Sequence, residues 1–96
     1  MKLLKLKTKD PEQASTLLQE AISNELKLIQ TGIDQLQAEI RTFEQKYRQS
    51  SKEFFRKYQQ GKAGDQSDFI DWAGLYQLLL DLRQESLQLK EIEICN

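Results

Sequence analysis

The chain has 96 residues, of which 39% are hydrophobic and 30% are charged. This length allows one small domain with too little apolar surface for a large core. A mean hydropathy of −0.67 argues against a membrane protein. With only four Gly and one Pro, the composition disfavours a loop-rich β-sandwich or barrel and favours an all-α domain with long helices.

Residues that commonly carry chemistry are scarce. The sequence has no His and a single Cys, Cys95, so nucleophilic triads and the usual transition-metal sites lack candidates. We therefore expect a non-enzyme without catalytic residues, metal or cofactor. Cys95 has no partner for an internal disulfide, and the first residues do not have the form of an export signal, so we expect a cytoplasmic protein.

The first helix has a clear predicted start. Within residues 1–9, Leu4 and Leu6 alternate with Lys5 and Lys7, which places the two Leu on one side and favours either a short strand or an N-terminal arm. Asp10 then suits the N-cap of a helix. Pro11 suits the first helical position, because a backbone N–H there has no acceptor within the helix.

The strongest pattern in the chain is a heptad seam in this first helix. Its apolar residues recur at alternating steps of three and four, namely Ile22, Leu26, Ile29, Ile33, Leu36, Ile40 and Phe43. We predict one long helix over 10–60 that bends near 49–51, because Ser50 and Glu53 have the spacing of a capping box. Gly32 is a poor helix former within it, and we favour a continuous helix there.

A loop over 61–67 separates this helix from a second one, predicted over 68–90. The second helix carries an apolar stripe that Leu75, Leu78 and Leu82 widen to about half of its circumference. The predicted core comprises Phe54, Phe69, Trp72, Tyr76 and Leu79. Residues 91–96 are expected to form a tail, and for the end of the chain a short strand and a frayed end both stay open.

These elements predict a single helical domain over 1–96, in which the long first helix packs on the C-terminal helix. A helical hairpin within one chain and a coiled-coil dimer both fit the seam. Because the first helix is much longer than the segment 68–86 that would cover it, we expect the seam to join two copies in a homodimer. Alternating termini suit strand addition to a partner's sheet, so the predicted partner contacts are Leu4, Leu6, Ile92 and Ile94.

The segment 41–58 is basic and also rich in aromatic residues, a combination found in proteins that bind nucleic acid. The aromatic residues lie mostly on the seam, where core packing explains them more simply. A nucleic-acid-binding, operon-autoregulating protein that uses this segment therefore stays the alternative function, beside a coiled-coil scaffold.

A more specific pattern occupies the middle and the end of the chain. It comprises 43–47 (Phe-Glu-Gln-Lys-Tyr), 50–54 (Ser-Ser-Lys-Glu-Phe), Gly61, 64–65 (Gly-Asp) and 68–76 (Asp-Phe-Ile-Asp-Trp-Ala-Gly-Leu-Tyr). This run resembles the small helical antitoxin-type proteins that prokaryotes encode beside small toxins, the partners of TumE-type toxins being the nearest. In that group a Gly is expected directly after the Tyr, where this chain has Arg48.

The resemblance implies a cytosolic, non-catalytic protein that acts by binding a partner protein, such as a cognate toxin. It carries over no functional residues. The sequence as a whole therefore predicts a protein-binding module that self-associates and binds or neutralises a partner encoded nearby, without membrane attachment.

Overall fold

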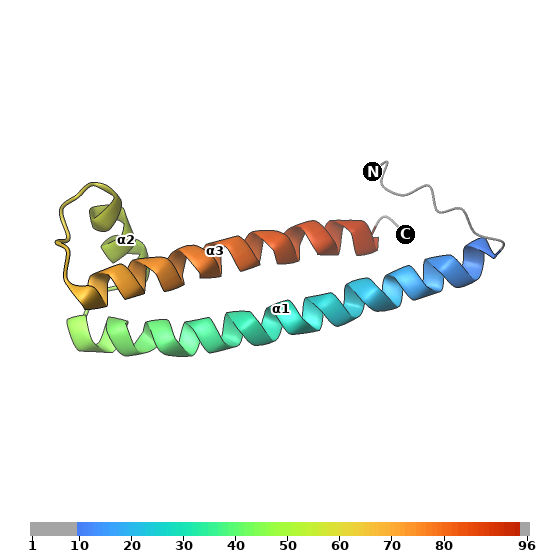
Figure 1. Ribbon diagram of the computed structural model, residues 1–96, viewed down its shortest axis with the longest axis horizontal. Coiled ribbons are helices and arrows are strands. Elements are labelled where there is room, and N and C mark those ends of the chain that lie inside the picture. Colours follow the sequence, from blue (N-terminus) through green and yellow to red (C-terminus); the bar gives the residue numbers. More distant parts are fainter. Residues whose placement is uncertain (1–9, 95–96) are drawn as a thin grey trace.

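The computed structural model describes residues 10–94, which form three α-helices and no strand. The helices are α1 (Pro11–Tyr47), α2 (Ser51–Gln59) and α3 (Ser67–Ile94). Helices α1 and α3 run antiparallel as a hairpin, and the short α2 lies at the end where the chain turns back (Figure 1). We call this the α2 end and the opposite end the open end. The predicted all-α fold, with a long first helix packed on the C-terminal helix, is confirmed.

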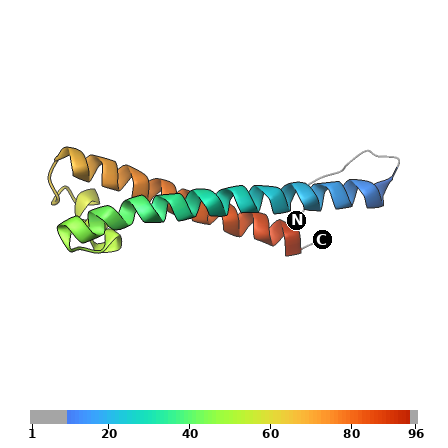
Figure 2. The ribbon, with the colours of Figure 1, turned by 90° about the horizontal axis from the view of Figure 1, so that it is seen from below.

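Helix α1 begins where the sequence signals place its start. The Asp10 side chain accepts a hydrogen bond from the Gln13 N–H at 3.0 Å, and Pro11 occupies the first turn. The helix continues through Gly32, where a Cβ would lie 3.3 Å from the Leu82 Cδ1 of α3. The glycine therefore marks a close approach between the helices, which cross when the hairpin is seen from below (Figure 2).

The bend predicted near 49–51 is a complete break between two helices. Arg48 ends α1 in the left-handed conformation, with φ of 51° and ψ of 48°, and its N–H donates to the Glu44 carbonyl oxygen. Ser50 then caps α2, since its side chain accepts from the Glu53 N–H at 3.2 Å. The single helix predicted over 10–60 is thus two helices, because a left-handed residue reverses the chain direction within one turn.

Helix α3 extends further than the sequence suggested, from Ser67 to Ile94. The strand and the frayed end considered for the last residues are both wrong up to Ile94. The physical reason is that Leu82 and Leu89, seven residues apart, keep facing α1 and pack against the core. Helical spacing therefore outweighs the local alternation of apolar and charged residues.

The core lies along the contact between α1 and α3 and is densest at the α2 end. Trp72 and Phe54 are the largest fully buried side chains, and their rings stack with centroids 3.8 Å apart. The rings of Phe43 and Tyr47 flank Trp72 at 5.8 and 5.9 Å. This aromatic cluster joins all three helices.

Candidate partner-binding groove

An open, largely apolar groove lies between α1 and α3 near the α2 end. It has a volume of about 730 Å³ and is lined by Glu39, Thr42, Phe43, Ile70, Asp71, Gly74, Leu75 and Leu78. Ile70 and Leu78 are 53% and 47% exposed, respectively, although both are large hydrophobic side chains. Exposed apolar surface gathered in a concave region is typical of sites that bind a partner. We call these eight residues the apolar groove.

The groove exists because α3 carries more apolar surface than α1 covers. Ile70, Gly74 and Leu78 are spaced four residues apart, so they form one row along α3. A Cβ at Gly74 would meet nothing within 4 Å, so open space lies between the two large side chains. Gly74 costs the helix about 1 kcal/mol relative to Ala, and the space it leaves admits a side chain from outside.

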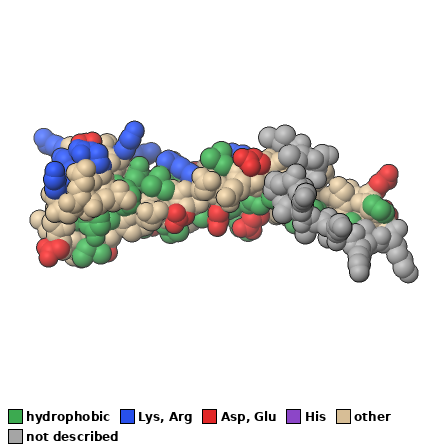
Figure 3. All heavy atoms as spheres, turned by 90° about the horizontal axis from the view of Figure 1, so that it is seen from above, with side chains coloured by type: hydrophobic (Ala, Val, Ile, Leu, Met, Phe, Trp, Pro, Cys, Tyr) green, Lys and Arg blue, Asp and Glu red, His purple; other side chains and the backbone are tan. Residues whose placement is uncertain are grey.

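Acidic residues border the apolar groove. Glu39 lines it from α1 and Asp71 from α3, and neither Lys nor Arg is among the lining residues. The space-filling view shows hydrophobic side chains gathered towards one long edge of the α2 end and Lys and Arg side chains along the opposite edge (Figure 3). The groove thus combines an apolar floor with a negative rim.

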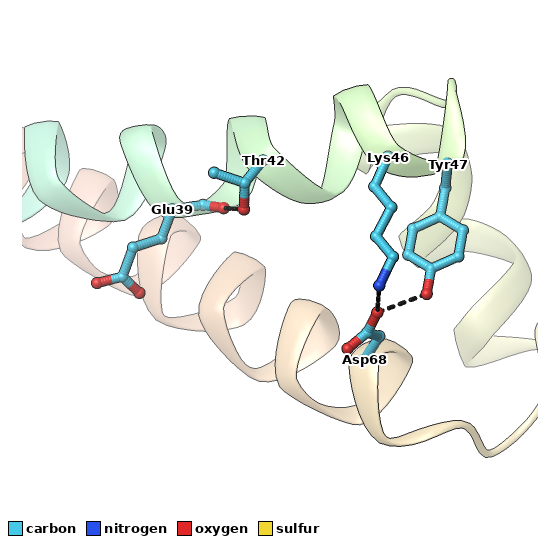
Figure 4. A network of polar contacts seen from close by, with 5 residues as sticks. All are labelled: Glu39, Thr42, Lys46, Tyr47 and Asp68. Atoms are coloured by element: carbon cyan, nitrogen blue, oxygen red, sulfur yellow. Dashed lines mark hydrogen bonds and ion pairs between the residues drawn. The ribbon is translucent and has the colours of Figure 1, made fainter.

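A polar network ties the end of α1 to the start of α3, one helical turn beyond the groove. Asp68 Oδ2 accepts hydrogen bonds from Lys46 Nζ at 2.7 Å and from the Tyr47 hydroxyl at 2.5 Å (Figure 4). These two donors lower the pKa of Asp68, with the Lys46 hydrogen bond as the larger cause. The pKa values of Lys46 and Tyr47 are raised, in both cases chiefly by the hydrogen bond to Asp68.

A second network fixes α2 against both long helices. Trp72 Nε1 donates to Ser51 Oγ at 2.8 Å, and Ser51 donates to Glu44 Oε2 from its hydroxyl at 2.8 Å and from its N–H at 2.9 Å. Ser51 is 3% exposed. Because each buried polar atom has a partner, the network adds rigidity and leaves no unsatisfied group. The α2 end is therefore a stable support for the groove.

The predicted self-association seam is used within a single chain. Ile22, Ile29, Ile33, Leu36 and Ile40 are buried, and Leu26 and Phe43 are half-buried. From Ile29 to Ile40 the seam belongs to one core cluster with buried residues of α3. The argument for a second copy assumed a short C-terminal helix, whereas α3 has 28 residues and packs against the seam from Ile29 to Phe43.

The other predicted residues occupy different positions. Of the predicted core, Phe54, Trp72 and Leu79 are buried, and Phe69 and Tyr76 are half-buried beside them. Leu4 and Leu6 lie outside the described residues. Ile92 is half-buried on α3 and lines a hollow with Ile29, and Ile94 is the last helical residue. Ile92 and Ile94 belong to a helix and not to a strand in this structure, and their contact with a partner stays a prediction.

The fold disperses the bases of the segment 41–58. Lys46 binds Asp68, and Arg56 pairs with Glu53 on α2. Arg48 ends α1, whereas Arg41 and Lys52 line a separate groove. The aromatic residues of the segment pack against the core. The segment is therefore not a continuous stacking platform for nucleic-acid bases.

Sequence reasoning missed Ile70, Gly74 and the groove as a whole. The width of the apolar stripe on the last helix, which includes Leu78, could have indicated the groove. A stripe of about half the circumference exceeds what one partner helix covers. The excess surface on α3 is the apolar side of the groove.

Comparison with known proteins adds no relative: no family model, curated protein or solved structure matches the chain. Within residues 10–94, no group of three or more acidic, Cys or His side chains is placed to hold a metal ion. None of the helices described is both long enough and apolar enough to cross a membrane.

Proposed function

We propose that this chain is a non-catalytic protein-binding module and that the apolar groove receives an amphipathic helix of a partner protein. The observation that carries the proposal is the pair of exposed side chains, Ile70 and Leu78, on either side of the open space at Gly74. Helices that dock in grooves do so through apolar anchors at such spacing. Here the row on α3 offers contacts for anchors one turn apart.

The charge of the groove specifies the partner helix further. Because Glu39 and Asp71 border the groove and no base lines it, a partner helix with Lys or Arg beside its apolar anchors is complementary. An acidic helix would meet like charges at the rim. The proposed partner surface is therefore basic and amphipathic.

The resemblance to antitoxin-type proteins gives this partner an identity to test. We infer a cytoplasmic toxin encoded beside this chain, which binding through the groove would neutralise. A homodimer is not needed for this proposal, since the part of the seam from Ile29 to Phe43 packs within one chain, and dimerisation through the seam stays a prediction.

The test is co-expression of this chain with the tagged product of the adjacent reading frame. We expect both proteins to copurify and the growth defect caused by the neighbour alone to be relieved. The double variant Ile70→Asp/Leu78→Asp is expected to weaken binding by at least about 30-fold, since anchor residues at interface centres are worth 2 kcal/mol or more. Growth would then no longer be rescued.

Two further variants separate a lost groove from a lost fold. Leu17→Asp/Leu28→Asp places the same two charges on exposed leucines outside the groove and should leave binding unchanged. Gly74→Leu fills the open space, favours the helix and should block binding without adding charge. All variants should keep the helical circular dichroism spectrum. Binding that survives both Gly74→Leu and Ile70→Asp/Leu78→Asp would refute the groove as the docking site.

A further inference from the structure

A second groove, polar rather than apolar, lies on the other flank of the hairpin. It has a volume of about 330 Å³, and all three helices contribute cations to it: Arg41 of α1, Lys52 of α2 and Arg83 of α3. An adjoining hollow of about 350 Å³ shares Gln37 and Arg83 with it and adds Lys90. Together the two hollows form a track with four basic residues, which we call the basic track.

Among the described side chains, the four cations of the basic track form no ion pair. The ion pairs found within residues 10–94 are Lys46–Asp68 and Arg56–Glu53, and neither involves a residue of the track. The single carboxylate that lines the track is Glu44, which accepts both donors of Ser51. Four cations therefore face one carboxylate that is already engaged.

This set of residues differs from the basic segment seen in the sequence. Only Arg41 and Lys52 come from 41–58, and Arg83 and Lys90 come from α3, which the fold brings alongside. Arg83 and Lys90 are seven residues apart, so they are separated by about 10.5 Å along the helix. Three of the cations thus meet in one groove, and Lys90 continues the track along α3.

We infer that the basic track binds the phosphate backbone of a nucleic acid. The main groove of the track is lined mostly by polar atoms, unlike the apolar groove, so a protein segment would have less apolar surface to bury there. Phosphate backbones instead bind through Lys and Arg, with counterion release as the main source of free energy. Gln37 and Tyr76 line the same track, and both side chains carry neutral hydrogen-bond donors.

The net charge of −1 does not oppose this assignment. Exposed charges are screened over about 8 Å at physiological ionic strength, so a bound phosphate senses the cations of the track and not the acids of the opposite flank. The assignment is also independent of the apolar groove, since the two sites share no residue.

The experiment is fluorescence anisotropy of a labelled duplex DNA and a labelled single-stranded RNA, each of about 20 nucleotides per strand, between about 50 and 200 mM salt. The full chain is expected to bind at least one of them. With four phosphate contacts on a duplex, the logarithm of the binding constant should fall with the logarithm of the salt concentration with a slope of about −3.6.

A pair of double variants with equal charge change makes the test specific. Arg41→Gln/Arg83→Gln should reduce the magnitude of the slope by about two and lower the affinity more than tenfold at low salt. Lys27→Gln/Lys62→Gln removes two exposed cations that lie outside the track and should change the affinity less than about twofold. Circular dichroism of both variants should match that of the unmodified chain.

Three results would overturn the inference. The first is no binding of either probe at the lowest salt concentration. The second is an equal loss of affinity in the two double variants, which would mean that net charge alone matters. The third is displacement of the probe by an acidic polyglutamate peptide at equal charge concentration, which would assign the track to acidic protein segments.

Discussion

The two ends of the hairpin are held together by different forces. At the α2 end three helices meet around stacked aromatic rings, and every side-chain hydrogen bond found between two of the described helices lies there. Towards the open end, α1 and α3 contact each other through aliphatic side chains such as Ile29, Leu82 and Leu89. The α2 end thus has directional contacts in addition to apolar burial.

This difference explains where binding surface is found. The apolar groove lies at the α2 end, and the basic track begins there, since Lys52 of α2 and Ser51 line it. Sites on rigid supports keep their geometry, whereas regions with few fixed contacts open locally. The apolar groove and the start of the basic track, which we propose as recognition surfaces, therefore lie where the structure is most constrained.

The largest predicted effect comes from breaking the α2 end at its centre. Trp72→Ala removes the fully buried ring that stacks on Phe54 and the donor to Ser51, and should cost about 3–5 kcal/mol of unfolding free energy. Ile29→Ala, at the open end, should cost about 2 kcal/mol, because two helices joined by aliphatic contacts close a cavity more easily. Urea denaturation followed by circular dichroism measures both.

One result would contradict the predicted difference in stability between the two ends. If Ile29→Ala lowers the unfolding free energy as much as Trp72→Ala does, the two ends contribute equally and the asymmetry has no energetic meaning. Trp72→Phe serves as a control, since it keeps a ring against Phe54 and loses only the indole N–H donor.

A smaller effect, of opposite sign, is expected at the junction between α1 and α2. Arg48 has a φ of 51°, which L-residues with a Cβ adopt at a cost and glycine adopts freely. Arg48→Gly should therefore raise the unfolding free energy by about 0.5–1 kcal/mol. The gain is partial because the unfolded chain has more conformational entropy with Gly than with Arg at this position. The midpoint of urea denaturation would rise accordingly.

Arg48→Ala is the matched control, because it removes the long side chain and keeps the Cβ. It should leave the stability nearly unchanged. Equal stabilisation by Ala and Gly would mean that the arginine side chain, and not the backbone conformation, is responsible.

Local signals in the sequence predicted the helix boundaries well. Asp10 and Pro11 begin α1, and Ser50 with Glu53 begins α2, because capping depends on residues only three positions apart. The Gly expected after Tyr47 from the antitoxin resemblance coincides with the left-handed residue, although this chain has Arg48 there. The all-α hairpin follows from two apolar stripes of helical period.

The sequence did not show which apolar faces of the helices pack against each other and which stay exposed. A heptad seam shows that one face of a helix is buried and does not show whether α3 or a second copy buries it. In the structure α3 packs against it from Ile29 to Phe43, and the predicted end of that helix at residue 90 lies before its observed end at Ile94. The apolar groove was hidden for the same reason, since Ile70 and Leu78 are exposed only because α1 covers the other side of α3. The basic track joins three helices, so no single segment reveals it.

The smallest of the three effects is a pH dependence at the α2 end. Lys46 and Tyr47 lower the pKa of Asp68 below the ordinary value of 3.8, so the folded state favours the charged carboxylate. Its contribution to stability is fully present above the pKa of the unfolded chain and is lost as the pH falls through the lower pKa of the folded protein. The effect is small because the Lys46 and Asp68 side chains are 63% and 34% exposed, and water screens their attraction.

The variants of this network should give a graded response when urea denaturation is measured from neutral pH down to about pH 2. Asp68→Asn should abolish this part of the acid-induced loss, and Tyr47→Phe should reduce it, since one of two donors remains. As the carboxylate is protonated, the α2 end loses the ion pair that joins α1 and α3 directly, whereas the hydrogen bonds through Ser51 remain. If Asp68→Asn and the unmodified chain lose stability in parallel on acidification, the network contributes nothing to the difference between the two ends.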